Sequence, residues 1–166
     1  MKGLLVTNEE LLDAWPGIRI DQDNAAYFGG LLNQQLLMNR CEECSRWHHP
    51  PRPICPACWS RSLVPTPVAG TGSVALVTIL RQGPSQPGVD YRDGHPLVAI
   101  ELDEQPGLRF AGTIIDTPPA DIAVGDRVEM VWRTVPGRRA RPDFRISSTP
   151  NGATPTADTT PSGADR

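Results

Sequence analysis

Four cysteines stand between positions 41 and 58 in two pairs, and two residues separate the members of each pair. They are Cys41, Cys44, Cys55 and Cys58. A two-residue spacer lets the backbone turn back so that both sulfurs face one ion, and two such turns complete a tetrahedron. Four thiolates suit a soft metal and leave no coordination position open for water or substrate. The spacing therefore predicts a closed, structural metal centre whose binding energy contributes to folding.

Zinc is the metal that we expect in this centre. Iron fits the same four thiolates, but the chain offers no second redox element. Two other interpretations are reduced core cysteines and a redox-active pair. A redox pair would need electropositive, partly open surroundings, and the duplicated spacing argues against it.

Two histidines and two tryptophans accompany the cysteines. Because the cysteines already supply a tetrahedron, we expect His48 and His49 to lie on the surface of the ribbon rather than to bind the metal. Trp47 and Trp59 are expected to shield the metal and to pack the ribbon on the rest of the protein. Stacking on a base or an adenine ring is the alternative for these indoles.

Composition narrows the class of protein. The chain has 166 residues and a net charge of −3, so no global basic field attracts nucleic acid or anionic lipid. The first twelve residues lack the apolar core of a secretory signal, and no apolar run is long enough for a membrane span. Clustered cysteines without an export signal indicate a metal site rather than disulfides. We therefore expect a cytoplasmic protein.

Two short helices are expected before the cysteines. Asn8 is the expected N-cap of the first, with Glu9 and Glu10 in its first turn, and Pro16 ends it. The second should begin at Asp23 or Asn24 and run to about residue 33.

An apolar stripe lies along the second helix. Its members recur at helical spacing and are Tyr27, Phe28, Leu31 and Leu32. The stripe fits two interpretations equally well: packing on the protein's own body, or docking on a partner. Gly29 and Gly30 weaken the helix prediction, since each costs about 1 kcal/mol relative to Ala.

From Gly70 onward the hydrophobic pattern has a period of two, which indicates strands. Five are expected, over 74–80, 98–102, 108–114, 128–132 and 144–146. The predicted fold class is mainly β: an N-terminal helical segment (1–35), a four-cysteine zinc ribbon (36–66), a five-stranded barrel (67–148) and a disordered tail (149–166). An oligonucleotide/oligosaccharide-binding (OB) barrel fits the strand count best, although an SH3-like barrel shares the periodicity. The tail contains no large apolar residue that could offset its ordering entropy.

Several motifs, taken in order, resemble the DUF35 family. They are Asn24–Phe28, Leu36, Arg40–Cys44, Pro50–Cys58, Gly70–Val74, Val124–Val128 and Pro142–Phe144. The similarity covers about residues 20–148, and the cysteine pairs with Pro-Pro-Arg between them are its most specific part. It implies a helical piece and a rubredoxin-like zinc ribbon joined to an OB barrel. Family knuckles carry Gly after the second cysteine, where the chain needs positive φ; here Ser45 and Trp59 occupy those positions.

The resemblance also implies a function. DUF35 proteins act as non-catalytic partners of thiolase-like (lipid-transfer-protein type) aldolases and thiolases, or of MaoC-type enoyl-CoA hydratases, on acyl-CoA thioesters. Some serve bacterial steroid side-chain degradation. On this basis we expect the chain to be a hetero-oligomeric accessory subunit with no catalysis of its own and with acyl-CoA at the interface.

A cluster of arginines follows the fourth predicted strand. Arg138, Arg139 and Arg141 could pair with the phosphates of CoA, because a guanidinium matches phosphate oxygens. A solvated loop is the favoured alternative for such a run. The sequence shows no nucleophile elbow, HExxH motif, Walker A loop or dinucleotide fingerprint, which supports a binding role.

Two competing functions use the same expected parts. A single-stranded nucleic-acid module would need aromatic and basic residues on one outer barrel face. Here Phe110, Trp132 and Phe144 fall in the apolar phase expected to point inward. The other competitor is an iron-containing electron carrier, which a red colour would reveal.

Overall fold

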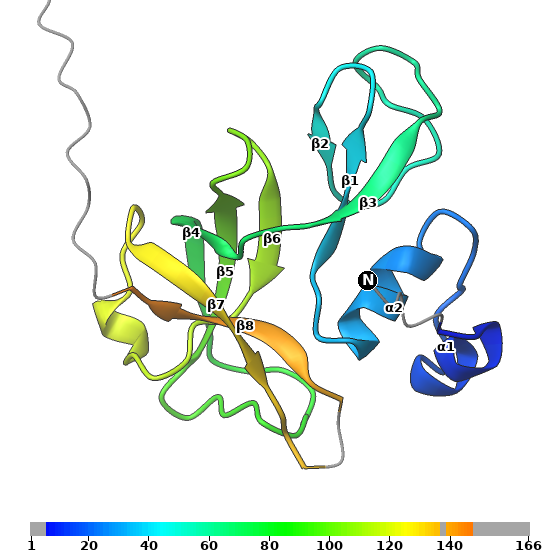
Figure 1. The fold of residues 1–166 in the computed structure, drawn as a ribbon. Helices are drawn as coiled ribbons and strands as arrows, with labels where there is room; N and C mark the ends of the chain where they lie inside the picture. The colour runs from blue at the N-terminus through cyan, green and yellow to red at the C-terminus, as the bar shows by residue number, and fades with distance from the viewer. Residues whose placement is uncertain (1–5, 137–138, 148–166) are drawn as a thin grey trace, which may run out of the picture.

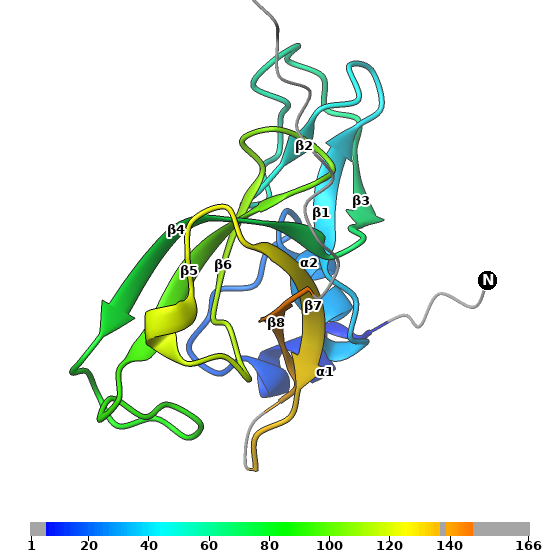
Figure 2. The same cartoon turned by 90° about the vertical axis from the view of Figure 1, so that its left-hand side faces the viewer.

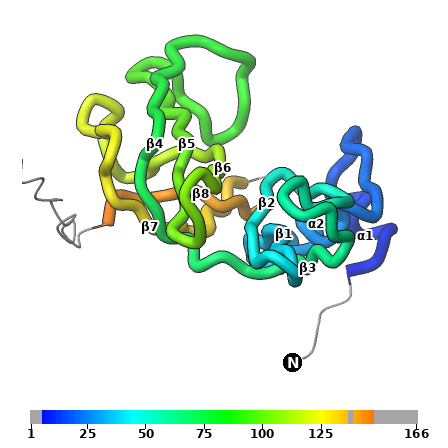
Figure 3. Tube along the Cα trace, turned by 90° about the horizontal axis from the view of Figure 1, so that it is seen from above, coloured from blue at the N-terminus to red at the C-terminus, as the bar shows by residue number. Residues whose placement is uncertain are grey.

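The computed structural model describes residues 6–136 and 139–147, so the predicted tail lies outside the described residues. The described chain forms a helical pair, a small three-stranded ribbon and a five-stranded barrel (Figure 1). The helical pair and the ribbon lie together on one side, and the barrel lies on the other (Figure 3). No helix in the described part of the chain is long and apolar enough to cross a bilayer.

Helix α1 spans Asn8–Ala14, and its N-cap is Thr7, not Asn8 as predicted. The Thr7 hydroxyl accepts a hydrogen bond from the Glu10 backbone N–H at 3.2 Å, and the Glu10 carboxylate accepts one from the Thr7 N–H at 2.8 Å. This reciprocal capping box satisfies two donors, whereas a cap at Asn8 satisfies at most one. The correction therefore follows from Glu10, which sits three residues after Thr7.

Helix α2 spans Ala25–Leu32 and ends where the chain folds back on it. The Gln35 N–H donates to the Gly30 carbonyl at 2.8 Å. A Cβ on Gly30 would lie 2.7 Å from the Gln35 carbonyl and from the Leu37 side chain. Gly30 is thus required by a close backbone approach, and this accounts for a glycine that its helix propensity alone disfavours.

The ribbon consists of β1 (Leu37–Cys41), β2 (Trp47–His48) and β3 (Leu63–Pro67) in the antiparallel order β2-β1-β3. A single connection leads from β3 into the barrel (Figure 1). Two side-chain bonds fix the ribbon against the barrel: Gln105 accepts from the Trp47 N–H at 3.0 Å and donates to the Trp47 carbonyl at 3.3 Å. Trp47 packs on the core as predicted.

The barrel has the five strands that the sequence predicts, namely β4 (Thr71–Leu80), β5 (His95–Leu102), β6 (Arg109–Gly112), β7 (Arg127–Arg133) and β8 (Arg141–Ile146). A 3-10 turn, η1 (Pro119–Asp121), lies between β6 and β7. The antiparallel order is β6-β5-β4-β7-β8. A parallel bridge between Ile114 and Phe144 joins the two ends, with the Ile115 N–H 2.8 Å from the Phe144 carbonyl. The sheet is therefore closed (Figure 2), with the connectivity of an OB barrel.

One hydrophobic core serves all three parts. Its buried members are Leu31 from α2, Leu36 and Met38 from the start of the ribbon, Val68, and the barrel residues Val74, Val98, Ile100, Leu102, Leu108, Phe110, Ile114, Ile122, Val128 and Phe144. Phe144 is fully buried, Phe110 is 7% exposed, and Trp132 packs against this cluster. The predicted inward direction of these aromatics is confirmed.

A chain of aromatic rings crosses the boundary between the parts. His49 lies between Tyr27 of α2 and Phe110 of β6, with ring centroids 5.4 and 5.6 Å away. Burial lowers the pKa of His49, because an apolar environment disfavours the imidazolium. The His49 Nδ1 atom is buried without a hydrogen-bond partner among the described residues. The neutral ring is therefore the form that this contact accommodates.

The burial of His49 predicts that the folded protein loses stability in acid. Since the folded-state pKa of His49 lies below its unfolded value near 6.5, the unfolded chain binds more protons as the pH falls through that value. The free energy of unfolding should therefore fall as the pH is lowered from about 7 through about 6.5, and it should level off below the folded pKa. Urea melts across this range measure it. His49→Phe, which keeps a ring at the site, should lose less stability than the wild type; an equal loss would assign the effect to His48 and His95, whose pKa values are also lowered by burial.

Candidate metal centre

The four cysteines that the sequence singles out meet at one point. Their Sγ atoms all lie within 4.8 Å of one another, and none forms a disulfide. The Cys41–Cys58 and Cys44–Cys55 sulfur pairs are each separated by 3.6 Å. Zn–S bonds of about 2.3 Å in a tetrahedron place sulfurs about 3.8 Å apart. The donor set and its spacing therefore fit one tetrahedral metal ion.

Two similar turns hold the sulfurs in place. In the first, the Ser45 N–H donates to the Cys41 carbonyl at 2.9 Å; in the second, the Trp59 N–H donates to the Cys55 carbonyl at 2.9 Å. Ser45 has φ of 60° and Trp59 has φ of 62°. Both knuckles therefore adopt the left-handed conformation that favours glycine, as the resemblance implies, although neither position carries one.

Backbone N–H groups are directed at the sulfurs. Those of Cys44 and Glu43 lower the pKa of the Cys41 thiol to about 7. At Cys55, burial opposes ionisation, but the N–H groups of Ala57 and Cys58 produce a net lowering of the pKa. The thiols of Cys44 and Cys58 show the opposite direction. The Ser60 N–H lowers the pKa of Cys58, yet burial and the neighbouring sulfurs raise it overall, to about 12.

These directions have a common electrostatic origin. Two sulfurs can ionise with help from the backbone, but four thiolates in contact repel one another. A bound cation removes that repulsion and releases the remaining protons. The cluster is therefore a pre-arranged cation site rather than a set of inert core cysteines.

The aromatic and imidazole neighbours differ in their placement. Trp59 is 79% exposed, so the prediction that it shields the metal is wrong. Cysteine spacing alone does not reveal this exposure. His48 is half-buried, and its Nε2 lies 3.3 Å from the Cys55 sulfur. Neither His48 nor His49 belongs to the group of mutually close ligand atoms.

The left-handed knuckles predict a stabilising substitution. Ser45→Gly should raise the free energy of unfolding by up to about 1 kcal/mol, because a left-handed non-glycine residue costs roughly 1–2 kcal/mol and glycine's extra unfolded-state entropy offsets part of it. Chemical denaturation of the metal-loaded protein measures the change. Ser62→Gly, at a position without positive φ, is the control and should be neutral or destabilising. A loss of stability in Ser45→Gly would contradict the strain argument.

Three of the four predicted docking residues pack in or against the core, and the fourth, Leu32, is half-buried and lies outside that cluster. Leu31 is buried in the core, and Tyr27 and Phe28 pack against it. The apolar side chains left exposed near this segment are Leu12 and Ile18, at 57% and 43%. Packing thus accounts for most of the stripe, and its contact with a partner stays a prediction.

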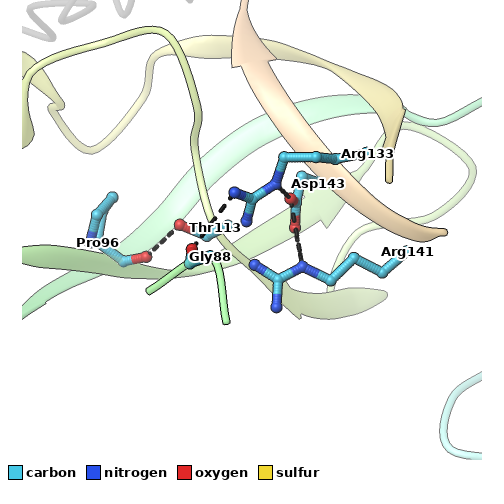
Figure 4. A network of polar contacts seen from close by, with 6 residues as sticks. All are labelled: Gly88, Pro96, Thr113, Arg133, Arg141 and Asp143. Atoms are coloured by element: carbon cyan, nitrogen blue, oxygen red, sulfur yellow. Dashed lines mark hydrogen bonds and ion pairs between the residues drawn. The ribbon is translucent and has the colours of Figure 1, made fainter. Parts of the chain in front are cut away.

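Two of the three predicted CoA-binding arginines lie in the described part of the chain, and each contacts another group of the protein. Arg141 contacts the carboxylate of Asp143 at 3.2 Å, and Arg133 forms a second ion pair with the same carboxylate (Figure 4). Arg139 donates to the Ala14 carbonyl at 3.3 Å, and Arg138 lies outside the described residues. Asp143 is 2% exposed. Nothing in the local sequence marks Asp143 as a buried charge, because its partners are set by strand pairing.

Comparison with known proteins supports both parts of the structure. Residues 28–64 match the family model of the ChsH2 rubredoxin-like zinc ribbon domain, and residues 65–133 match that of the ChsH2 C-terminal OB-fold domain. The former match includes all four cysteines. It is consistent with the metal fit deduced from the sulfur geometry.

Relatives fall into two groups. A DUF35 domain-containing scaffold protein of Pyrococcus furiosus is 37% identical over 101 residues, which cover 61% of this chain and 71% of that protein. A probable enoyl-CoA hydratase alpha subunit of Thermomonospora curvata is 30% identical over 130 residues. Those residues are 78% of this chain but 39% of the hydratase subunit, so this chain spans less than half of that relative.

A solved structure is also similar. A chain of the Ltp2-ChsH2(DUF35) aldolase is 29% identical to this protein and superposes with a TM-score of 0.67, over 78% of this chain and 98% of that one. The ribbon, the closed barrel and the four-cysteine cluster agree with these matches. The chain belongs to the DUF35 family, with a ChsH2-type rubredoxin-like zinc ribbon and OB-fold.

Proposed function

We propose that this protein is a non-catalytic accessory subunit of a thiolase-like aldolase or thiolase that acts on acyl-CoA thioesters, and that its four cysteines hold a structural zinc. The observation that carries the proposal is the similarity to a chain of the Ltp2-ChsH2(DUF35) aldolase over 98% of that chain. A MaoC-type enoyl-CoA hydratase is the second candidate partner, favoured by the likeness to the Thermomonospora hydratase subunit. Steroid side-chain thioesters are the finer substrate class that we propose.

Zinc would be held by Cys41, Cys44, Cys55 and Cys58. Four sulfurs complete a tetrahedron, so the ion would have no position for substrate and would stabilise the ribbon instead. Iron would need a role in electron transfer, for which the described residues provide no second redox group. Zinc therefore suits a scaffold better than iron does.

The N-terminal helices are the docking face that we favour. Leu12 projects from α1 beside a hollow of about 370 Å³ that is also lined by Ile20 and Ala25. The hollow is also lined by the polar residues Asn8, Asp21 and Gln22, so an exposed leucine stands at its edge beside polar groups, a mixture that suits contact with a protein partner. Arg139 is anchored to the carbonyl of Ala14 at the end of α1, which places one of the proposed CoA-binding arginines near this face.

The nucleic-acid alternative receives less support from the barrel. Phe110 and Phe144 lie in the core, so they are not available for stacking on bases. The net charge of −3 also disfavours a polyanion partner. Docking on a protein partner requires neither exposed aromatic rings on the barrel nor a net positive charge.

Affinity capture of the tagged protein from its native cells tests the proposal. Mass spectrometry should identify a thiolase-like or MaoC-like enzyme in near-stoichiometric amount, and the purified pair should show activity on acyl-CoA that this chain alone lacks. Recovery of nucleic acid, or of neither enzyme, would overturn the subunit role. Leu12→Lys should weaken capture, whereas Val124→Lys, at a side chain 65% exposed on the barrel, should not.

A further inference from the structure

One histidine contacts the metal-binding cluster without being part of it. His48 is the last residue of β2, and its backbone pairs with Asn39 of β1. This pairing places its Nε2 atom 3.3 Å from the Sγ of Cys55. Cys55 is the most buried of the four cysteines, with an exposed fraction of 0%. The contact is therefore made on the interior side of the cluster, away from the exposed Cys58.

The negative charge of the metal-bound cluster explains why a hydrogen-bond donor beside the Cys55 sulfur would be stabilising. Four thiolates around a divalent ion carry a net charge of −2, and taking negative charge out of water is costly unless donors compensate for it. Cys55 already receives the backbone N–H groups of Ala57 and Cys58. Water cannot reach its sulfur, so a further donor has to come from a side chain.

We propose that His48 is a positioning residue of the metal centre: its imidazole carries a proton on Nε2 and donates an N–H···S hydrogen bond to the Cys55 thiolate. A metal-bound thiolate can only accept a hydrogen bond, so the short contact is favourable in the Nε2–H tautomer alone. The bond would hold Cys55 at the buried side of the centre and reduce the charge on its sulfur.

The inference rests on the proposed metal centre, and cadmium-113 substitution separates the two. In the full-length protein loaded with ¹¹³Cd²⁺, a scalar coupling between ¹¹³Cd and the His48 Nε2–H proton should be detectable through the sulfur. A loaded protein in which His48 carries its proton on Nδ1, with no such coupling, would overturn the His48 role and leave the metal centre intact. A protein that binds neither cadmium nor zinc would overturn the centre, and this inference with it.

Variants give a second, independent measurement. His48→Phe keeps an aromatic ring but removes the donor, and it should lower zinc affinity about 10-fold to 100-fold in chelator competition. In the cobalt-loaded form, the sulfur-to-cobalt charge-transfer band should move to lower energy, because a thiolate without its donor is easier to oxidise. His48→Gln retains an N–H donor, so its zinc affinity and its band position should lie between those of the wild type and His48→Phe. His95→Phe, at a histidine remote from the sulfurs, is the control; the same affinity and band position in His48→Phe and wild type would overturn the proposal.

Discussion

Cys44→Ala is expected to abolish tight metal binding and to unfold the ribbon knuckles. Structural zinc contributes about 10–16 kcal/mol to small zinc domains, and three ligands cannot close the tetrahedron. Between Cys41 and Ser60 only Cys41 and Cys55 belong to the buried hydrophobic set, so apart from the contacts of Trp47 and His49 little else would hold this part of the ribbon. Inductively coupled plasma mass spectrometry should find less than one metal ion per chain. Hydrogen exchange should show that the backbone amides of both knuckles have lost their protection.

The unfolding should stop at the shared core. Leu36 and Met38 at the base of the ribbon are buried with the barrel residues, and Gln105 fixes Trp47 from the barrel side. The barrel amides should therefore stay protected in Cys44→Ala. Ala57→Ser, an exposed change between Cys55 and Cys58, is the matched control and should retain the metal. A folded, fully protected Cys44→Ala ribbon without metal would contradict a structural role for the centre.

The metal centre could be predicted from the sequence because its geometry is local. A two-residue spacer determines where both sulfurs of a knuckle point, and the left-handed residue that follows each pair was expected from the family's glycines. The barrel strands were predictable for a similar reason, since period-two patterning with turn glycines determines which side chains enter a core. Thr7 could also have been recognised as the cap, because Thr-x-x-Glu is a readable capping box.

Features that depend on tertiary packing could not be predicted in this way. Nothing in the local sequence places His48 against Cys55 or directs the Trp59 indole into solvent; both follow from how the knuckles turn. Gly30 lowers helix propensity, yet the returning chain requires it. The arginine pair around Asp143 illustrates the same limit, because the pairing of β7 with β8 brings Arg133 and Arg141 to that carboxylate.

Asp143→Asn is expected to be among the most destabilising single changes in the barrel. The Asp143 side chain is 2% exposed and is shared by Arg133 and Arg141, whose side chains are 24% and 31% exposed. Asparagine keeps the shape but leaves two guanidinium groups facing each other without an anion. Removing one partner of a buried ion pair costs about 3–5 kcal/mol, and partial exposure of both arginines places the expected cost near the lower limit, at about 3 kcal/mol. Thermal denaturation should show a fall in Tm of roughly 10 °C.

Glu129→Gln is the matched control for this prediction. Glu129 pairs with Arg145 between the same two strands at 3.3 Å, but both side chains are about half exposed. Water solvates the arginine that is left behind, so this change should cost less than about 1 kcal/mol. Equal losses of stability in the two variants would show that the burial of Asp143 does not determine how much its two ion pairs contribute.

A second substitution tests the electrostatic explanation. Arg141→Leu in the Asp143→Asn background should recover stability, since it removes the like-charge contact that the first substitution creates. No recovery would contradict the electrostatic explanation.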